Sequence, residues 1–109
     1  MTYQPTTAEL NDLLRNTFIT GWIMLSDGVK SLPEHVRDDV ITRVRAFDEF
    51  STDNDPHGEH DFGAFEHPSA GKVFWKIDYF DLEGVNHSPD PSNPEVTRRL
   101  LTIMLAHEY

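Results

Sequence analysis

The fold is decided by one stretch of the sequence, Val73-Phe74-Trp75-Lys76-Ile77-Asp78-Tyr79-Phe80. Its side chains alternate with a period of two, which is the period of an extended strand. One face of this predicted strand is apolar and carries Val73, Trp75, Ile77 and Tyr79. The other face carries Phe74, Lys76, Asp78 and Phe80. We expect that second face to be either an exposed binding surface or a face buried under the N-terminal helix.

Two more strands are expected beside this one. Asp61–Glu66 fits a partner strand, joined through His67–Gly71, a loop with Pro and Gly that is long enough for a wide hairpin. Gly63 inside that partner strand indicates either the close approach of an aromatic ring or a local bulge. A third strand is predicted at Gly21–Leu25, followed by an exit turn at Ser26–Gly28.

Three helix starts are predicted by a recurring pair, a hydroxyl residue followed three positions later by Glu, whose side chains satisfy N–H groups of a first turn. The pairs are Thr6–Glu9, Ser31–Glu34 and Ser92–Glu95, with Pro33 and Pro94 inside the second and third first turns. Apolar residues then follow at helical spacing. They are Leu10, Leu13, Leu14 and Phe18; Val36, Val40, Ile41, Val44 and Phe47; and Val96, Leu100, Leu101, Ile103, Met104 and Leu105. The last set is the broadest, so we expect the closing helix to be the most deeply buried.

These segments predict one α+β domain over residues 1–109, in the order α-β-α-β-β-α. We expect a small antiparallel sheet of about three strands packed against helices. A chain of 109 residues has the length of a single domain. Residues 81–93 are rich in Pro, Asp, Ser and Asn, so they are expected to form an irregular surface connection.

The chain is acidic, and the acidity is concentrated in one place. Nineteen Asp and Glu residues against nine Lys and Arg residues give a formal net charge of −10. That charge argues against direct binding to nucleic acid or to an anionic membrane, because both require clustered positive charge. Residues 48–66, which we name the acidic segment, hold seven acidic residues and no Lys or Arg.

Several kinds of site are excluded by what the sequence lacks. Without cysteine there is no disulfide and no thiolate metal site. No nucleophile elbow, phosphate loop or dinucleotide motif is present, so neither a cofactor nor a catalytic residue is predicted. Lys76 and Asp78 could transfer a proton together with Asp61, although a solvent-facing ion pair is the commoner role. No run is apolar enough to span a membrane, and Met1–Gln4 lacks the features of a secretory signal, so we expect a cytoplasmic protein.

Three strings of the sequence carry a resemblance to a known family. They are Phe47-Asp48-Glu49-Phe50-Ser51-Thr52-Asp53-Asn54-Asp55-Pro56-His57-Gly58-Glu59-His60-Asp61-Phe62-Gly63, Phe74-Trp75-Lys76-Ile77-Asp78-Tyr79-Phe80-Asp81 and Val96-Thr97-Arg98-Arg99-Leu100-Leu101-Thr102-Ile103-Met104-Leu105-Ala106. Through them the chain resembles, over nearly its whole length, a family of small bacterial proteins catalogued only as a domain of unknown function. Members of that family are often associated with plasmids and other mobile elements. The resemblance implies one compact bacterial domain and no established activity, so no catalytic residue follows from it.

The acidic segment favours an interaction function. Its carboxylates could imitate the spaced negative charge of a nucleic-acid backbone, and attraction to a basic groove would raise the association rate. We therefore expect a non-enzymatic interaction module that docks on the basic surface of a protein such as a nucleic-acid-binding protein, acting as an inhibitor, a decoy or an anti-defence protein. The predicted binding residues are Asp48, Glu49, Asp53, Asp55, Glu59, Asp61 and Glu66. The alternative is a solvated acidic edge that only keeps the protein soluble.

A metal site is the second hypothesis for the acidic segment. Its candidate ligands are His57, Glu59, His60 and Asp61. Imidazole and carboxylate groups together suit Zn, Mn or Fe, which would make the chain a metal-binding or metal-dependent hydrolase domain. A calcium loop starting at Asp53 is a poor match, because Ala64 stands where the bidentate Glu belongs. The structural alternative is a turn at Asp55–Gly58 in which Asp and Asn side chains cap backbone groups.

Overall fold

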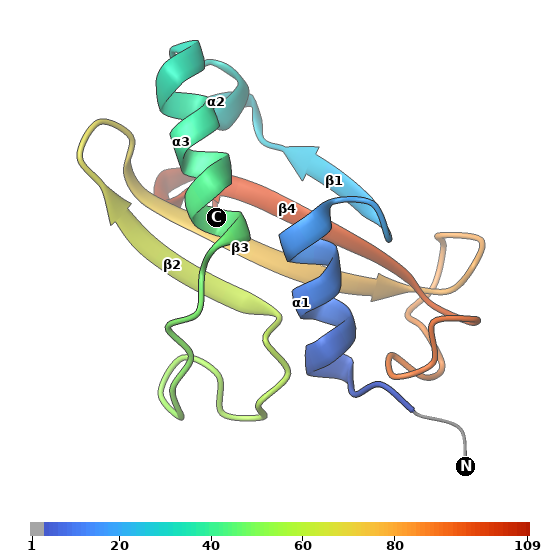
Figure 1. Cartoon of the computed structure of the whole chain (residues 1–109). Coiled ribbons are helices and arrows are strands. Elements are labelled where there is room, and N and C mark those ends of the chain that lie inside the picture. Colours follow the sequence, from blue (N-terminus) through green and yellow to red (C-terminus); the bar gives the residue numbers. More distant parts are fainter. Residues whose placement is uncertain (1–3) are drawn as a thin grey trace.

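Four strands form one sheet in the order β1-β4-β3-β2 (Figure 1). The computed structural model of the chain describes residues 4–109; Met1–Tyr3, the first residues of the stretch considered above for a secretory signal, lie outside the described residues. The strands are β1 (Trp22–Leu25), β2 (Phe62–His67), β3 (Gly71–Phe80) and β4 (Arg98–Leu105). The helices are α1 (Thr7–Thr17), α2 (Asp27–Lys30) and α3 (Glu34–Arg45), and a short 3-10 turn, η1 (Ala106–Glu108), follows β4.

The predicted α+β class and the three predicted strands are confirmed. β2 and β3 form the expected antiparallel hairpin, in which Gly63 is the register partner of Trp75. The number and direction of the strands differ from the prediction, because β1 pairs with β4 in parallel while β4 pairs with β3 antiparallel. The sheet is therefore mixed and has four strands rather than about three.

The predicted closing helix is wrong, because residues 98–105 form β4 in the middle of the sheet. The element order is accordingly α-β-α-α-β-β-β. β4 lies between two other strands and has apolar residues on both faces, so its sequence is a nearly continuous apolar run. Helical and extended spacing both fit such a run, and period alone cannot distinguish them. The Ser92–Glu95 pair starts no helix and lies in the irregular connection, which extends from residue 81 to 97.

The first predicted helix start is confirmed, and the second is wrong. The Thr6 hydroxyl accepts a hydrogen bond from the Glu9 N–H, and the Glu9 carboxylate accepts one from the Thr6 N–H. α3 begins at Glu34 with Pro33 as its N-cap residue and without a side-chain cap, so the Ser31–Glu34 pair forms no capping box. The helix forms nonetheless, because its apolar positions are buried against the sheet.

The exit turn predicted after β1 is also wrong. Ser26 is instead the N-cap residue of the short helix α2, and its hydroxyl accepts a hydrogen bond from the Val29 N–H. Ser31 is the C-cap residue of the same helix. A serine in the N-cap position favours a helical turn because it satisfies an N–H group that has no intrahelical partner.

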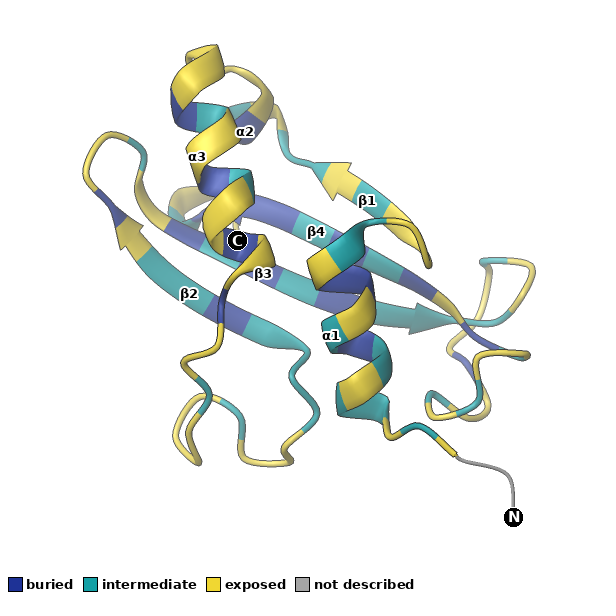
Figure 2. Cartoon of the chain, viewed as in Figure 1, coloured by how far each residue is buried: buried dark blue, intermediate teal, exposed yellow. Residues whose placement is uncertain are grey.

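α1 and α3 lie on one face of the sheet, and the hydrophobic core fills the space between them and the strands (Figures 1 and 2). The apolar faces predicted for the first two helices and for β3 supply most of this core. No helix within residues 4–109 combines the length and the apolar character needed to cross a membrane. The buried core residues are Leu14, Val29, Val36, Val40, Val44, Phe47, Val73, Trp75, Ile77, Leu101, Ile103 and Leu105.

Candidate functional site

The acidic segment leaves the end of α3, passes through a loop and enters β2 (Figure 1). Its seven carboxylates do not share one environment (Figure 2). The exposed residues are Asp48, Glu49, Asp53 and Glu66. The partly buried residues are Asp55, Glu59 and Asp61. Glu66 also lies apart from the others, because it belongs to β2 and not to the loop.

Asp55 stabilises the loop from within. Its side chain is only 6% exposed. Its carboxylate accepts hydrogen bonds from the backbone N–H of Glu59 at 3.0 Å and of His60 at 3.3 Å. Nearby, the Asn54 side chain accepts a hydrogen bond from the Ser51 N–H and donates one to the Glu49 carbonyl, both at 2.8 Å. The predicted turn with Asp and Asn caps is therefore present.

His60 attaches the loop to α1. Its Nδ1 lies 2.9 Å from an oxygen of Asp12, which also forms a 3.0 Å ion pair with Arg15. The imidazole stacks on the ring of Phe50, with centroids 3.9 Å apart and planes 3° from parallel. The backbone of His60 has a φ of 56°, in the left-handed region that is unfavourable for a residue with a side chain. These contacts hold the residue in that conformation.

Asn11 of α1 is the centre of a second group of contacts that attach the acidic segment to the rest of the protein. Its side-chain amide donates to the Glu59 carbonyl at 2.9 Å and to the Tyr79 hydroxyl at 2.7 Å, while its oxygen accepts from Arg99 Nε at 2.8 Å. The Tyr79 hydroxyl in turn donates to Asp61 at 3.1 Å. Burial raises the pKa of Tyr79 and lowers the pKa of Arg99 from their ordinary values. The network holds Asp61 and Glu59 in place through fully or partly buried partners.

The four residues of the metal hypothesis do not converge. His60 contacts Asp12 and Phe50, whereas Asp61 accepts its hydrogen bond from Tyr79 on the sheet. His57 is exposed in the turn. In the part of the chain that the structure describes, no group of three or more His, Asp or Glu side chains is positioned to hold a metal ion.

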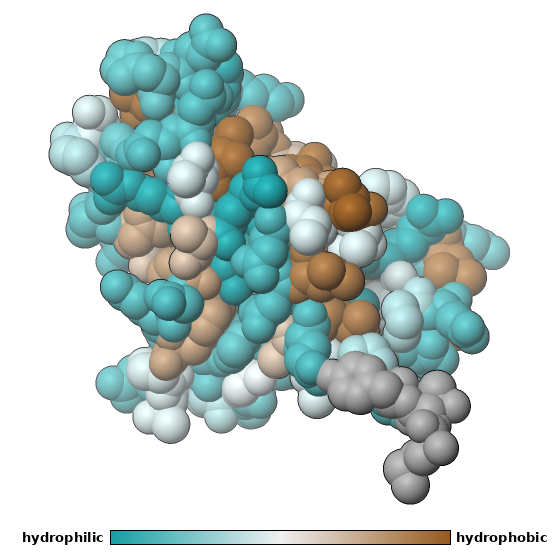
Figure 3. Space-filling view, viewed as in Figure 1, coloured by the Kyte–Doolittle hydropathy of each residue, from teal (hydrophilic) through white to brown (hydrophobic). Residues whose placement is uncertain are grey.

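The helix-bearing side of the molecule is largely hydrophilic over α3, and apolar atoms gather near the end of α1 beside β1 (Figure 3). Two apolar side chains of this region are well exposed, Leu13 at 46% and Ile19 at 81%. They are separate side chains on a helix and the turn after it, and single exposed apolar residues of this kind are normal.

The opposite side of the sheet is a second candidate surface, which we name the open face. The alternative that the N-terminal helix buries this face is wrong, because α1 packs on the other side, where Asn11 contacts Tyr79. Two of its apolar residues are strongly exposed, Trp22 at 45% and Met24 at 52%. Strand alternation places on it Trp22 and Met24 of β1; Phe62, Ala64 and Glu66 of β2; Lys72, Phe74, Lys76, Asp78 and Phe80 of β3; and Arg98, Leu100, Thr102 and Met104 of β4.

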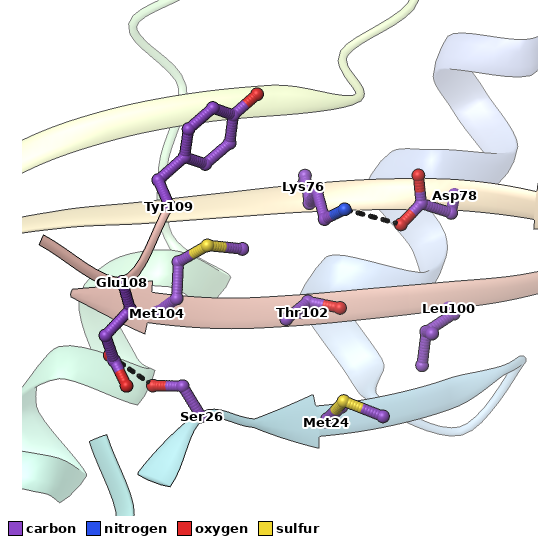
Figure 4. Close-up of a pocket in the computed structure, with 9 residues that line it drawn as sticks. All are labelled: Met24, Ser26, Lys76, Asp78, Leu100, Thr102, Met104, Glu108 and Tyr109. Carbon is purple, nitrogen blue, oxygen red and sulfur yellow. Dashed lines mark hydrogen bonds and ion pairs between the residues drawn. The ribbon is translucent and has the colours of Figure 1, made fainter. Parts of the chain in front are cut away.

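A shallow hollow of about 570 Å³ lies on the open face. Lys76 and Asp78 point toward one another in it and form a 3.1 Å ion pair, as expected for neighbouring charges on one strand face (Figure 4). At its rim the Glu108 carboxylate accepts hydrogen bonds from the Ser26 hydroxyl at 2.6 Å and from the N–H groups of Leu105 and Gly28. The Ser26 hydrogen bond is the main cause that lowers the pKa of Glu108. The hollow is lined by Met24, Ser26, Lys76, Asp78, Leu100, Thr102, Met104, Glu108 and Tyr109.

Sequence reasoning identified the β3 part of the open face and missed the rest. Leu100 and Thr102 were not predicted on this face, because residues 98–105 were expected to form a helix, and Met24 was missed because no face was assigned to the strand predicted at Gly21–Leu25. The sequence does contain a strand signal here, the alternation of Arg99, Leu101 and Ile103 with Leu100 and Thr102. The same residues also fit helical spacing, so this signal could not distinguish a strand from a helix.

The sequence profile of a family described as "Protein of unknown function (DUF3768)" matches residues 25–108. The chain belongs to the DUF3768 family. The resemblance to a domain of unknown function is thereby confirmed. In this member of the DUF3768 family the match includes the whole acidic segment, β2, β3 and β4, and it begins after α1. No curated protein and no solved structure matches the chain.

Proposed function

We propose that this member of the DUF3768 family is a cytoplasmic, non-enzymatic interaction module that presents an acidic face to a basic surface of another protein. We further propose that it is a bacterial protein of a mobile element and that it acts as an inhibitor or decoy. Its target is then an enzyme or regulator that binds nucleic acid, because such proteins carry basic grooves for the phosphate backbone.

The observation that carries the proposal is the unneutralised charge of the loop. Asp48, Glu49 and Asp53 are exposed. Within residues 4–109, no Lys or Arg nitrogen lies within 4.0 Å of any carboxylate of the acidic segment, although four other ion pairs of this kind occur. Acids whose only purpose is solubility are usually interspersed with bases, which is not so here.

The loop is also preorganised. Asp55 caps the turn, and His60 and Asn11 attach the loop to α1 and the sheet. A partner would therefore meet carboxylates whose backbone positions are already set, so less conformational entropy is lost on binding. Two of the seven predicted binding residues, Asp55 and Asp61, serve this internal role. Of the other five, Glu59 is partly buried and Glu66 lies apart on β2, so we take the exposed loop residues Asp48, Glu49 and Asp53 as the direct contacts.

The test compares two triple variants of equal net charge. The first carries Asp48→Asn, Glu49→Gln and Asp53→Asn. The matched control carries Glu34→Gln, Glu83→Gln and Glu95→Gln, three exposed acids outside the acidic segment. The probe is a labelled oligoarginine peptide, followed by fluorescence anisotropy over a salt series. Affinity should fall with salt, and the first variant should bind about tenfold more weakly than the control, since three exposed pairs of about 0.5 kcal/mol each are lost.

Equal binding by the two triple variants would show that only total charge matters, and the interaction proposal would then be wrong. The natural partner is sought by pull-down from a bacterial lysate at low and high salt with the same two variants. A protein that is captured by the control and lost from the first variant is the expected result.

Metal binding is the competing proposal for the same residues, and it predicts a different result. Zn or Mn would raise the melting temperature of the wild-type protein, and His57→Ala would abolish that rise without affecting folding, because His57 is exposed. Under the interaction proposal, neither metal changes the melting temperature and protein purified without chelator holds no stoichiometric metal.

A further inference from the structure

We propose that the partner of the acidic segment inserts an arginine side chain into a hollow between the end of α3 and the edge strand β2. This inference rests on the function proposed above and names the chemical group that the acidic segment recognises. It is carried by the size of the hollow, by the aromatic and charged side chains that line it, and by its place at the end of a helix.

The hollow lies where the chain leaves α3 and passes over β2 (Figure 1). Its volume is about 180 Å³, and it is open to solvent beside an edge strand of the sheet. Pockets for small molecules begin at about 300 Å³, so this hollow has the size for one side chain of a partner. It is lined by Arg43, Ala46, Phe47, Asp48, Glu49 and Phe65.

Two aromatic rings give the hollow an apolar lining. Phe47 is only 8% exposed and packs edge-on against Trp75, with ring centroids 5.5 Å apart. Phe65 is partly buried and lies on the helix-bearing face of β2, because its register partner is the buried Val73. A guanidinium group stacks on such rings more readily than an ammonium group, since it is planar and more weakly hydrated. The lining therefore favours arginine over lysine.

Two carboxylates of the lining are free to pair with that guanidinium. Asp48 and Glu49 are exposed, and neither carboxylate has a hydrogen bond or an ion pair within residues 4–109. Their backbone is already held in place. The Asp48 carbonyl accepts a hydrogen bond from the Phe50 N–H at 3.0 Å, and the Glu49 carbonyl accepts one from the Asn54 amide at 2.8 Å. A guanidinium has five N–H donors in a fixed plane, so it can bind both carboxylates at once.

Arg43, the basic residue of the lining, does not neutralise these two carboxylates. Its Nε donates to the Asp39 carboxylate at 2.9 Å, one turn back along α3, so the lining keeps an excess of negative charge. The C-terminal end of α3 also favours a cation through the helix dipole. On the inner side of the same helix end, the Arg15 guanidinium donates to the carbonyls of Val44 and Arg45 and lies over two aromatic rings.

The test compares labelled oligoarginine with labelled oligolysine of the same length by fluorescence anisotropy. The two peptides carry the same charge, so attraction to the negative charge alone does not distinguish them. The wild-type protein should bind oligoarginine about fivefold more tightly, which is the ratio expected for one additional contact between a guanidinium and an aromatic ring.

Phe65→Leu should lower this ratio to about one, because it removes the ring while it keeps an apolar side chain and every charge. Phe62→Leu is the matched control and should keep the ratio. Phe62 is also partly buried and lies on the same strand, but its side chain is on the open face. Ala46→Leu should abolish the ratio as well, since it fills the hollow without changing the charge. Ala46 is exposed, so this variant tests the hollow even if Phe65→Leu does not fold, which circular dichroism shows.

Equal affinity of the wild-type protein for the two peptides would overturn this inference, and so would a ratio that survives in folded Phe65→Leu and Ala46→Leu. Neither result contradicts the proposed function. That function fails if neutralising Asp48, Glu49 and Asp53 weakens the binding of oligoarginine no more than the matched triple variant does. The result expected is a loss of binding in the first triple variant together with a ratio that depends on Phe65.

Discussion

Gly63 of β2 lies directly beneath the indole ring of its cross-strand partner Trp75 in β3. A Cβ atom at position 63 would come within 2.6 Å of Trp75 Cε2, a distance that side chains do not tolerate. Trp75 is fully buried and also contacts Phe47 and the guanidinium of Arg15. The sequence indicated either an aromatic approach or a bulge at this glycine, and the structure shows the aromatic approach.

Gly63→Ala should therefore destabilise the protein by about 1–3 kcal/mol, the usual cost of adding a methyl group to a filled core. Urea unfolding monitored by circular dichroism measures the change. A double-mutant cycle with Trp75→Phe provides the control, because the smaller ring makes room for the added methyl. If the two substitutions are additive, the ring is not the cause of the destabilisation.

Asn11→Ala should lower the free energy of unfolding by about 2–4 kcal/mol, since it removes one hydrogen bond from each of three buried or partly buried polar partners. The partners affected are the Glu59 carbonyl, the Tyr79 hydroxyl and Arg99 Nε. Asn16→Ala is the matched control, because Asn16 lies on the same helix and is exposed. Equal losses from the two variants would mean that helix propensity, and not the network, determines the result.

Asp55→Ala should cost about 1–2 kcal/mol, in the range of other lost side-chain caps, whereas Asp53→Ala should stay within about 0.5 kcal/mol of the wild type. Asp55 accepts two backbone N–H groups in the turn, and Asp53 is exposed in the same loop. Thermal unfolding of both variants at neutral pH is the measurement. A larger loss for Asp53→Ala would contradict the division of the acidic residues into structural and exposed groups.

Glu108 should make the protein sensitive to acid. Its hydrogen bonds lower the pKa of the folded carboxyl below the ordinary value of 4.5. Its contribution to stability is therefore complete above pH 4.5 and is lost as the pH falls through the lower folded pKa.

In a pH series of melting temperatures, Glu108→Gln should be less stable than the wild type near neutral pH and should approach it under acid conditions. Ser26→Ala, which removes the main donor to Glu108, should reduce the acid dependence in the same direction. Melting curves of Glu108→Gln that run parallel to those of the wild type at all pH values would contradict this assignment.

Local patterns predicted the elements whose burial is one-sided. β3 has one buried face, so its alternation was visible, and α1 has a complete capping box at Thr6 and Glu9. β4 was missed because it lies between two strands and is apolar on both faces, which removes the alternation. The parallel pairing of β1 with β4 joins segments about eighty residues apart in sequence, and no local signal specifies such a contact.

The candidate site, like the fold, could be predicted from the sequence only in part. The position and charge of the acidic segment are properties of the sequence, and the turn at Asp55 follows from Asp and Asn side chains that act on their near neighbours. The different roles of Asp53 and Asp61 could not be predicted, because Asp61 is distinguished only by its bond to Tyr79. Which face of the sheet becomes the open face depends on the side against which α1 packs, and the sequence of β3 is compatible with either side.

By itself, the sequence determined the α+β class, the hairpin, two of the helices and the place of the negative charge, because these depend on residues that are neighbours along the chain. Only the tertiary structure decided which carboxylates face solvent and which face of the sheet α1 and α3 cover. Those outcomes depend on contacts such as that between Asn11 and Tyr79, 68 residues apart, whose formation requires the whole core to assemble.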